Sequence, residues 1–301
     1  MTVLAALLVL AAARYVERDS DRHVTAVTTT IAPSNDQPEQ WTKVWSDEFD
    51  GDQLDTSRWR PESSRFGQAT NNLQCYTPNN ISIVDGALQL QARRETVTCP
   101  NRTEHFTSGM VRGNLPVGFG AVEVRARMPE GAGFLPALWM LPVTKIYGSD
   151  GRSGEIDIAE VNTTNPEFVH GTVHWRYPDC GWGCSRYGGK IHAVEPTPAE
   201  DFHTYRVEWS PGRITWYLDG LGYYELGDEA QYKWGTAARQ PHPASPTYPE
   251  PFTADNQMYL ILNLAVGGDW PGTPPDSTPF PANMLIDYVR VYEPTAGTST
   301  S

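Results

Sequence analysis

Short segments in which apolar and polar side chains alternate constrain the fold of this chain most strongly. They recur from Trp45 onwards, are rich in β-branched and aromatic residues, and are separated by Gly, Pro, Asn or Asp. Because successive side chains of a strand point to opposite faces, such segments are typical of strands buried on one side. The clearest examples are residues 82–84, 87–92, 121–127, 205–209, 214–220 and 284–292. No sustained helical periodicity or long repeat is visible, so the pattern predicts an antiparallel all-β sandwich.

The alternating pattern also sets the expected domain limits. Residues 14–40 are polar, rich in Thr, Asp and Pro, and without periodicity, which predicts a disordered lead-in. We expect one domain over residues 41–294, because a chain of 301 residues with 39 % hydrophobic residues can build a single large core. The Pro-rich stretch 235–256 is expected to be a long surface loop, and residues 295–301 a tail.

Two features of the chain predict export. Residues 2–13 form an apolar run that ends in small residues, which is typical of a signal peptide over residues 1–13 and is short for a membrane span. No Lys or Arg precedes this run, so a short membrane anchor or a truncated gene start is the alternative. The spacing of Cys180 and Cys184 could close a small disulfide loop, and Cys75 would then pair with Cys99, although four cysteines permit three connectivities. We expect a secreted protein.

Charge and aromatic content narrow the class of partner. The net charge is −13, from 23 basic and 36 acidic residues, and a surface of this sign repels the phosphates of nucleic acids and of anionic membranes. Neutral ligands are unaffected by it. Ten Trp and fourteen Tyr stand against nine Phe. Their flat apolar faces and polar edges suit sugar rings, although most of them are expected to pack in the core.

Three carboxylates lie within one strand-like segment, at Glu155, Asp157 and Glu160. In a regular strand Glu155 and Asp157 share one face, and Glu160 is one residue out of phase with them. A β-bulge at Ile158 and Ala159 would absorb the extra residue and return Glu160 to the face of its partners. The sequence therefore predicts an acidic cluster on a bulged strand.

Such a cluster suits the hydrolysis of a glycosidic bond. Like charges raise one another's pKa values, and a glycosidase needs one ionised carboxylate and one that carries a proton. The span from Glu155 to Glu160 is compatible with the carboxyl separation of about 5–5.5 Å found in retaining enzymes. Asp157 could share a proton with the nucleophile. A solvated acidic edge or a calcium site is the alternative, but an exposed acidic strand does not normally alternate with Ile, Ala and Val.

The segment Glu155–Glu160 reads E-I-D-I-A-E, and further motifs occur in a fixed order along the chain. These motifs are 45–50 (WSDEFD), 71–76 (NNLQCY), 107–109 (TSG), 134–141 (FLPALWML), 171–174 (GTVH), 262–272 (LNLAVGGDWPG) and 286–292 (IDYVRVY). Together they resemble glycoside hydrolase family 16, in its laminarinase-like (endo-β-1,3-glucanase) branch. The resemblance implies a β-jelly-roll of two curved antiparallel sheets with a concave substrate cleft.

The resemblance also implies roles for individual residues. Glu155 is implied to be the nucleophile, Glu160 the general acid/base and Asp157 the assisting carboxylate. Four residues match positions that contact the sugar: Asn72, Trp139, His174 and Trp270. His174 matches a histidine beside the acid/base. The alternatives are that Trp139 belongs to the core and that His174 only braces its strand.

The implied activity is endo-hydrolysis of β-1,3-glucan or mixed β-1,3/1,4-glucan, so the expected partner is a β-glucan polysaccharide. We expect the mature domain to be a monomer that binds neither nucleic acid nor membrane. The bulged spacing favours this branch over lichenases, whose motif lacks the extra residue. Catalysis needs no cofactor, and a structural calcium is implied at Glu48, the carbonyl of Gly86 and Asp287, unless the two carboxylates only pair locally. A transglycosylase of the same mechanism is the alternative enzyme. A non-catalytic glucan-recognition protein would lack the acids that are present here.

Overall fold

The computed structural model describes residues 41–145, 153–175, 186–192, 195–227 and 251–295. The predicted signal peptide, the lead-in, most of the Pro-rich loop and the pair Cys180 and Cys184 lie outside these residues. The strands are β1 (Trp41–Asp47), β2 (Trp59–Pro61), β3 (Gln74–Tyr76), β4 (Ile81–Val84), β5 (Ala87–Ala92), β6 (Val97–Cys99), β7 (Arg102–Glu104), β8 (Phe106–Ser108), β9 (Met110–Gly113), β10 (Gly120–Arg127), β11 (Phe134–Pro142), β12 (Glu155–Glu160), β13 (Phe168–His174), β14 (Arg186–His192), β15 (His203–Ser210), β16 (Arg213–Leu218), β17 (Leu221–Gly227), β18 (Met258–Val266) and β19 (Ala282–Pro294). Two short 3₁₀ helices, η1 (Gln68–Thr70) and η2 (Pro78–Asn80), complete the regular structure.

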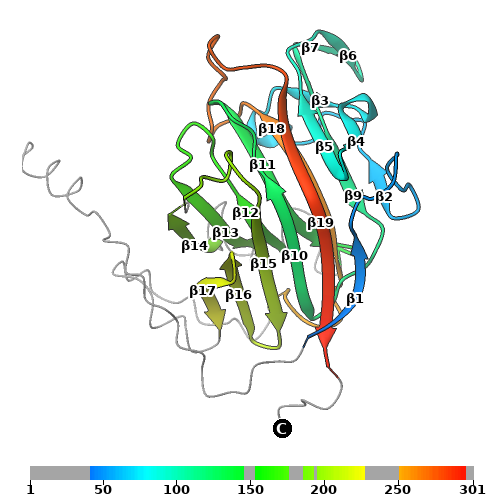
Figure 1. Cartoon of the computed structure of the whole chain (residues 1–301), viewed down its shortest axis with the longest axis vertical. Helices are drawn as coiled ribbons and strands as arrows, with labels where there is room; N and C mark the ends of the chain where they lie inside the picture. The colour runs from blue at the N-terminus through cyan, green and yellow to red at the C-terminus, as the bar shows by residue number, and fades with distance from the viewer. Residues whose placement is uncertain (1–40, 146–152, 176–185, 193–194, 228–250, 296–301) are drawn as a thin grey trace, which may run out of the picture. The chain divides into compact units, whose positions relative to one another are not determined.

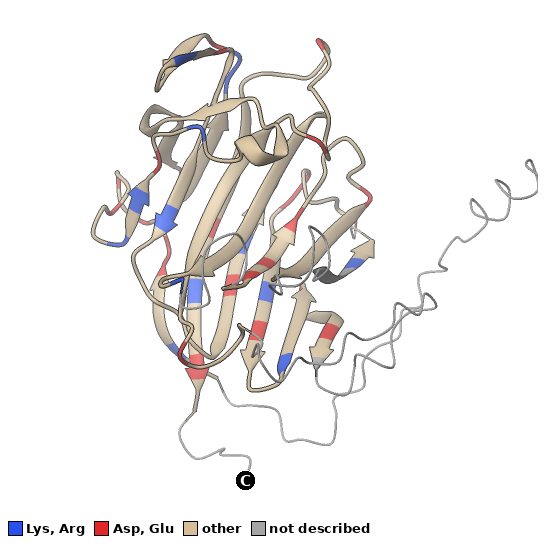
Figure 2. Cartoon of the chain, turned by 180° about the vertical axis from the view of Figure 1, so that it is seen from behind, with Lys and Arg blue, Asp and Glu red and all other residues tan. Residues whose placement is uncertain are grey.

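The strands form two large antiparallel sheets that face one another (Figure 1). Sheet A has the order β17-β16-β15-β10-β19-β5-β4, and β1 pairs with β19 outside this path. Sheet B has the order β14-β13-β12-β11-β18-β9-β2. Figure 2 shows the molecule from behind, with sheet B towards the viewer. The prediction of an antiparallel all-β sandwich is thereby confirmed. Within the described ranges, no helix is long and apolar enough to cross a bilayer.

The alternating pattern of each strand places its apolar residues between the sheets. On β10, Val122 and Val124 are buried in the core, whereas Glu123 and Arg125 point outwards. Strand β18 departs from alternation and is buried over most of its length. The reason is a second, smaller apolar cluster on the outer face of sheet B, formed by Tyr76, Met110 and Ile261, with Trp139, Leu141 and Tyr259 packed against it. Sheet B therefore carries apolar side chains on both of its faces.

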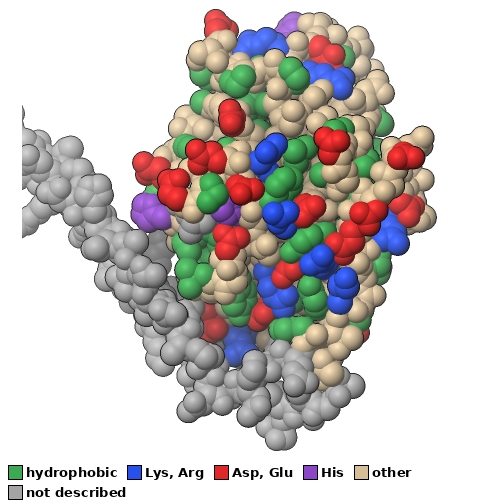
Figure 3. All heavy atoms as spheres, viewed as in Figure 1, with side chains coloured by type: hydrophobic (Ala, Val, Ile, Leu, Met, Phe, Trp, Pro, Cys, Tyr) green, Lys and Arg blue, Asp and Glu red, His purple; other side chains and the backbone are tan. Residues whose placement is uncertain are grey.

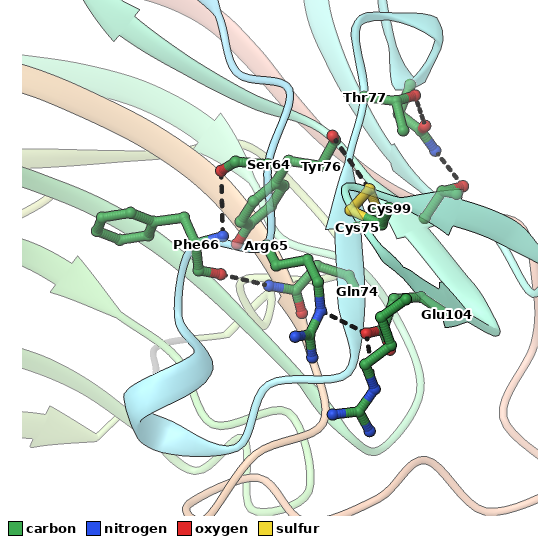
Figure 4. The surroundings of a disulfide bond; sticks show 12 residues. Ser64, Arg65, Phe66, Gln74, Cys75, Tyr76, Thr77, Cys99 and Glu104 are labelled. Carbon is green, nitrogen blue, oxygen red and sulfur yellow. Dashed lines mark hydrogen bonds and ion pairs between the residues drawn. A yellow bond between two sulfur atoms is a disulfide. The ribbon is translucent and has the colours of Figure 1, made fainter.

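A disulfide fastens the small β6–β7 hairpin to β3 (Figure 4). Cys75 and Cys99 are bonded with their Cα atoms 5.9 Å apart, as the expected pairing requires. An ion pair between Arg65 and Glu104 links the segment before β3 to the same hairpin. The amide Nε2 of Gln74 donates to the carbonyl of Phe66 at 3.4 Å. These contacts fix residues 64–76, a segment that reaches the outer face of sheet B.

Removal of this disulfide by Cys75→Ala with Cys99→Ala is expected to lower the free energy of unfolding by about 3 kcal/mol, because the bond closes a loop and restricts the unfolded chain. The two cysteines are 24 residues apart in sequence. Urea unfolding of the variant and of the wild type, with and without reductant, measures the loss. The exposed Thr98→Ala on the same hairpin is the control and should change stability little. Equal stability of the variant and the oxidised wild type would contradict the expectation.

Candidate active site

Strand β12 contains the predicted bulge. Against β13, Asp157 lies opposite Thr172 and Glu160 lies opposite His170, so three steps along β12 match two along β13. Against β11, the register passes from Asp157 to Ala159 over one step of the partner strand and omits Ile158. One residue of β12 is therefore extra on both sides. The prediction of a bulge at this place is confirmed.

Burial shows what the bulge does to the side chains. Ile158 and Ala159 are consecutive, yet both belong to the core between the sheets, with exposed fractions of 1 % and 0 %. A regular strand would turn one of them outwards. Because two inward residues follow one another, Glu160 returns to the outer face of sheet B, which Glu155 also occupies. Both glutamates are partly exposed, and Asp157 between them is buried.

Two carboxyl groups at the start of β12 and the imidazole at the end of β13 are closely packed. Nε2 of His174 lies 3.1 Å from Oδ2 of Asp157 and 4.0 Å from Oε1 of Glu155. Burial raises the pKa of the Glu155 carboxyl above its ordinary value of 4.5, and the negative charge of Asp157 raises it further, against the opposing effect of His174. The Glu155 carboxyl therefore keeps its proton to a higher pH than an isolated glutamate does.

The histidines do not lie as the resemblance implies. His174 stands opposite Glu155 and contacts Asp157, so it lies at the Glu155 end of the cluster. The residue opposite Glu160 is His170, whose ring meets the edge of the Trp270 ring at 4.9 Å between centroids. The expected place of His174 beside the acid/base is corrected accordingly. His170 was missed, although it is in phase with His174 along β13.

Trp139 lies on the outer face of sheet B and not in the core between the sheets. It is opposite Asp157 on the neighbouring strand, and its indole Nε1 donates to Oδ1 of Asn263 at 2.6 Å. Asn263 in turn donates to the hydroxyl of Tyr76 at 3.1 Å. The ring of Phe66, with 36 % of the residue exposed, lies 5.9 Å from the Trp139 ring between centroids. Sequence reasoning missed Phe66, which lies in none of the quoted motifs, and gave no role to Asn263, which lies in the motif 262–272.

Two segments far apart in sequence meet at the end of this face. Nδ2 of Asn72 donates to the carbonyl of Gly267 at 2.9 Å, and Oδ1 of Asn72 accepts from Thr70 at 2.7 Å. The Asn72 amide therefore holds the two segments together. Trp270 follows in the second segment and is 40 % exposed, as expected for a residue that contacts sugar. The sugar-binding roles of both residues stay predictions.

This arrangement of acids agrees with the comparison with known protein families. The sequence model of the family "Glycosyl hydrolases family 16" matches residues 67–278. The chain belongs to this family. It is therefore a glycoside hydrolase, and the predicted family resemblance is confirmed.

Individual relatives of this family 16 chain are similar over most of its length. A glucan endo-1,3-beta-glucosidase A1 from Niallia circulans is 37 % identical over 268 residues, which cover 83 % of this chain and 37 % of that protein. A beta-glucanase from Rhodothermus marinus is 39 % identical over 267 residues, covering 86 % and 87 %. Among solved structures, the laminarinase catalytic domain from Thermotoga maritima has a TM-score of 0.73 at 34 % identity, with 85 % of this chain and 99 % of that one covered. The jelly-roll fold implied by the sequence is thereby confirmed.

The residues that family 16 membership implies as calcium ligands have other partners here. Both carboxylate oxygens of Glu48 accept from the Arg290 guanidinium, at 3.0 and 2.8 Å. This hydrogen bonding holds the pKa of Glu48 below its ordinary value. Oδ2 of Asp287 accepts from Arg125 at 2.5 Å. The outer face of sheet A carries many such neighbouring charges of opposite sign (Figure 3). Carboxylates that are already neutralised by arginines do not fit the predicted oxygen cage with Gly86.

The pKa of Glu155 makes a prediction about stability. The unfolded chain loses this proton from about pH 4.5 upwards while the folded chain retains it, so this group lowers the free energy of unfolding progressively as the pH rises through its folded pKa. Glu155→Gln removes that loss. We expect its Tm to exceed the wild-type Tm at about pH 8 and the difference to shrink at about pH 5. Glu155→Asp keeps a carboxyl and is the control. A gain in Tm that is independent of pH would contradict the raised pKa of Glu155.

The arginine pairs make a second prediction. Because Glu48 and Asp287 are neutralised by Arg290 and Arg125, neither calcium chloride nor EGTA is expected to shift the Tm. Differential scanning calorimetry of the protein in each solution tests this. A calcium-dependent rise in Tm that is lost in Asp287→Asn would instead establish the calcium site implied by the sequence.

Proposed function

We propose that this family 16 chain is an endo-acting hydrolase of β-1,3-glucan of the laminarin type, which retains the configuration of the anomeric carbon. The observation that carries the proposal is the bulged strand β12, which presents Glu155, Asp157 and Glu160 beside Trp139. The names of the similar proteins from Niallia circulans, Rhodothermus marinus and Thermotoga maritima support the choice of glucan. A mixed β-1,3/1,4-glucan is the second substrate to be tested.

The first step of the proposed reaction forms a covalent intermediate. The glucan lies across the outer face of sheet B, with a sugar ring near Trp139. A carboxylate oxygen of Glu155 attacks the anomeric carbon while the bond to the leaving oxygen breaks, and Glu160 gives its proton to that oxygen. For this attack the proton shared by Glu155 and Asp157 must reside on Asp157. His174, at 3.1 Å from Asp157, helps to hold that carboxyl in place.

The second step releases the sugar. Glu160, now ionised, takes a proton from water, and the water oxygen attacks the anomeric carbon as the ester to Glu155 breaks. Two inversions in sequence give net retention. Both carboxyl groups return to their first state, and no cofactor takes part. If another sugar hydroxyl replaces water in this step, the product is a longer oligosaccharide, which is the transglycosylase alternative.

We further propose that the protein acts as a secreted monomer. The disulfide between Cys75 and Cys99 supports secretion, because such bonds persist in oxidising compartments. All of the carboxylates that the reaction needs come from one strand of one chain, which supports the monomer. Gel filtration of the purified protein and reducing against non-reducing mass analysis of the secreted product test the two statements.

Variants of the two glutamates test the proposed chemistry. Glu155→Gln and Glu160→Gln are each expected to lower kcat/KM on laminarin by about 10³-fold or more, because each removes a group that acts on the reacting atoms. Glu167→Gln, an exposed glutamate between β12 and β13, is the control and should keep wild-type activity. Laminarin and lichenan are compared by the rate at which reducing ends appear, and laminarin is expected to be cut faster.

The anomers formed with azide distinguish the two roles. In Glu155→Ala, azide takes the place of the missing carboxylate. It attacks the anomeric carbon from the face opposite the leaving group and should give an α-glycosyl azide. In Glu160→Ala, azide attacks the glycosyl-enzyme and should give the β-glycosyl azide with an activated aryl substrate. NMR of the products separates these cases. Exchange of the two anomers between the variants would overturn the assignment, and unimpaired Glu155→Gln would refute the mechanism.

A further inference from the structure

One side chain of sheet A crosses the core to reach the catalytic strand. Trp216 lies on β16 and is fully buried between the sheets. Its indole Nε1 donates a hydrogen bond of 2.8 Å to the backbone carbonyl of Asp157. Asp157 is the residue that immediately precedes Ile158, the residue omitted from the register with β11. The bond therefore ends at the point where the bulge begins.

A donor is needed at this point for a physical reason. A bulge disrupts the ladder of a sheet locally, and a carbonyl that faces an apolar core costs free energy unless a donor meets it. Ile158 and Ala159 are the next residues and lie in that core. The indole N–H brings a directional donor to the carbonyl from behind the sheet. We propose that Trp216 is a positioning residue, which fixes the bulge and thereby the orientation of Asp157 and Glu160 on the opposite face.

The strand next to the bulge is shaped for this contact. Gly171 on β13 lies between Thr172 and His170, the partners of Asp157 and Glu160. A Cβ atom at position 171 would overlap the ring of Trp216, at 2.7 Å from its Cγ, and would lie 2.6 Å from the hydroxyl of Tyr223. Glycine at this position thus leaves the space that the indole occupies.

The competing explanation is that Trp216 only fills the core. A comparison with Trp209 distinguishes this explanation from a positioning role. Trp209 lies on the neighbouring strand β15 and is 2 % exposed. Its Nε1 is buried without a hydrogen-bond partner among the residues that the structure describes. Both side chains fill the same core, but only the indole of Trp216 bonds to the catalytic strand. A replacement by Phe removes the N–H in each case and keeps an aromatic ring.

The inference rests on the glucanase activity proposed above, so laminarin hydrolysis by the wild type is measured first. Absence of that activity would refute the proposed function and not the role of Trp216. With an active wild type, Trp216→Phe is expected to lower kcat about 10- to 100-fold while KM stays within about twofold, because the carboxyl groups are displaced by a fraction of an ångström. Trp209→Phe should lower the Tm about as much as Trp216→Phe does, and it should keep the wild-type kcat.

Gly171→Ala gives a second route to the same contact. It displaces the indole without removing it, and it should lower kcat with little change in KM. The double variant Gly171→Ala with Trp216→Phe should be no slower than the slower single variant, because both disturb one bond. If Trp216→Phe does not fold, the kcat of Gly171→Ala decides alone. Full kcat in Trp216→Phe or Gly171→Ala, equal losses of kcat in the two Trp variants, or additive losses in the double variant would each overturn the proposal.

Discussion

The single extra residue of β12 is the constraint on which the rest of the site depends. Three carboxyl groups must point to one face, and the alternation of a strand allows this for Glu155 and Asp157 but not for Glu160. The extra residue corrects the phase by turning both Ile158 and Ala159 into the core. The arrangement of the acids on the outer face therefore requires two consecutive side chains to pack on the inner face. The small side chain of Ala159 limits the crowding there.

The close approach of Glu155 and Asp157 lowers the stability of the folded protein. Burial and the negative charge of Asp157 disfavour the charged form of Glu155 and raise its pKa. Such a pair persists because the surrounding sandwich, with long strands paired on both sides of β12, holds its backbone in place. His174 moderates the repulsion on the same face. A site of this kind is less stable than an apolar one would be, and the reaction proposed above makes use of the raised pKa of Glu155.

Local patterns predicted more of this structure than contacts between distant segments. Alternation and turn residues predicted the sheets, and one out-of-phase acid predicted the bulge, because both depend on neighbouring residues alone. The position of His174 was wrong because it depends on the register between β12 and β13, which no local pattern specifies. The arginine partners of the implied calcium ligands were missed for the same reason: Glu48 and Arg290 are 242 residues apart in the chain. The contact from Trp216 to Asp157 joins the two sheets and has no sequence motif at all.

Strand β12 is held from three directions, so the positions of its side chains do not depend on the loops around it. Strands β11 and β13 fix it within sheet B, and Trp216 reaches it from sheet A. The segments that contribute Phe66, Asn72 and Trp270 are instead joined to one another at the end of the face, with the disulfide hairpin behind the first of them. If these segments contact the sugar as predicted, changes in them would alter sugar binding without disturbing the bulge. On the function proposed above, the segments that select the sugar and the strand that carries out the chemistry are therefore held by separate contacts.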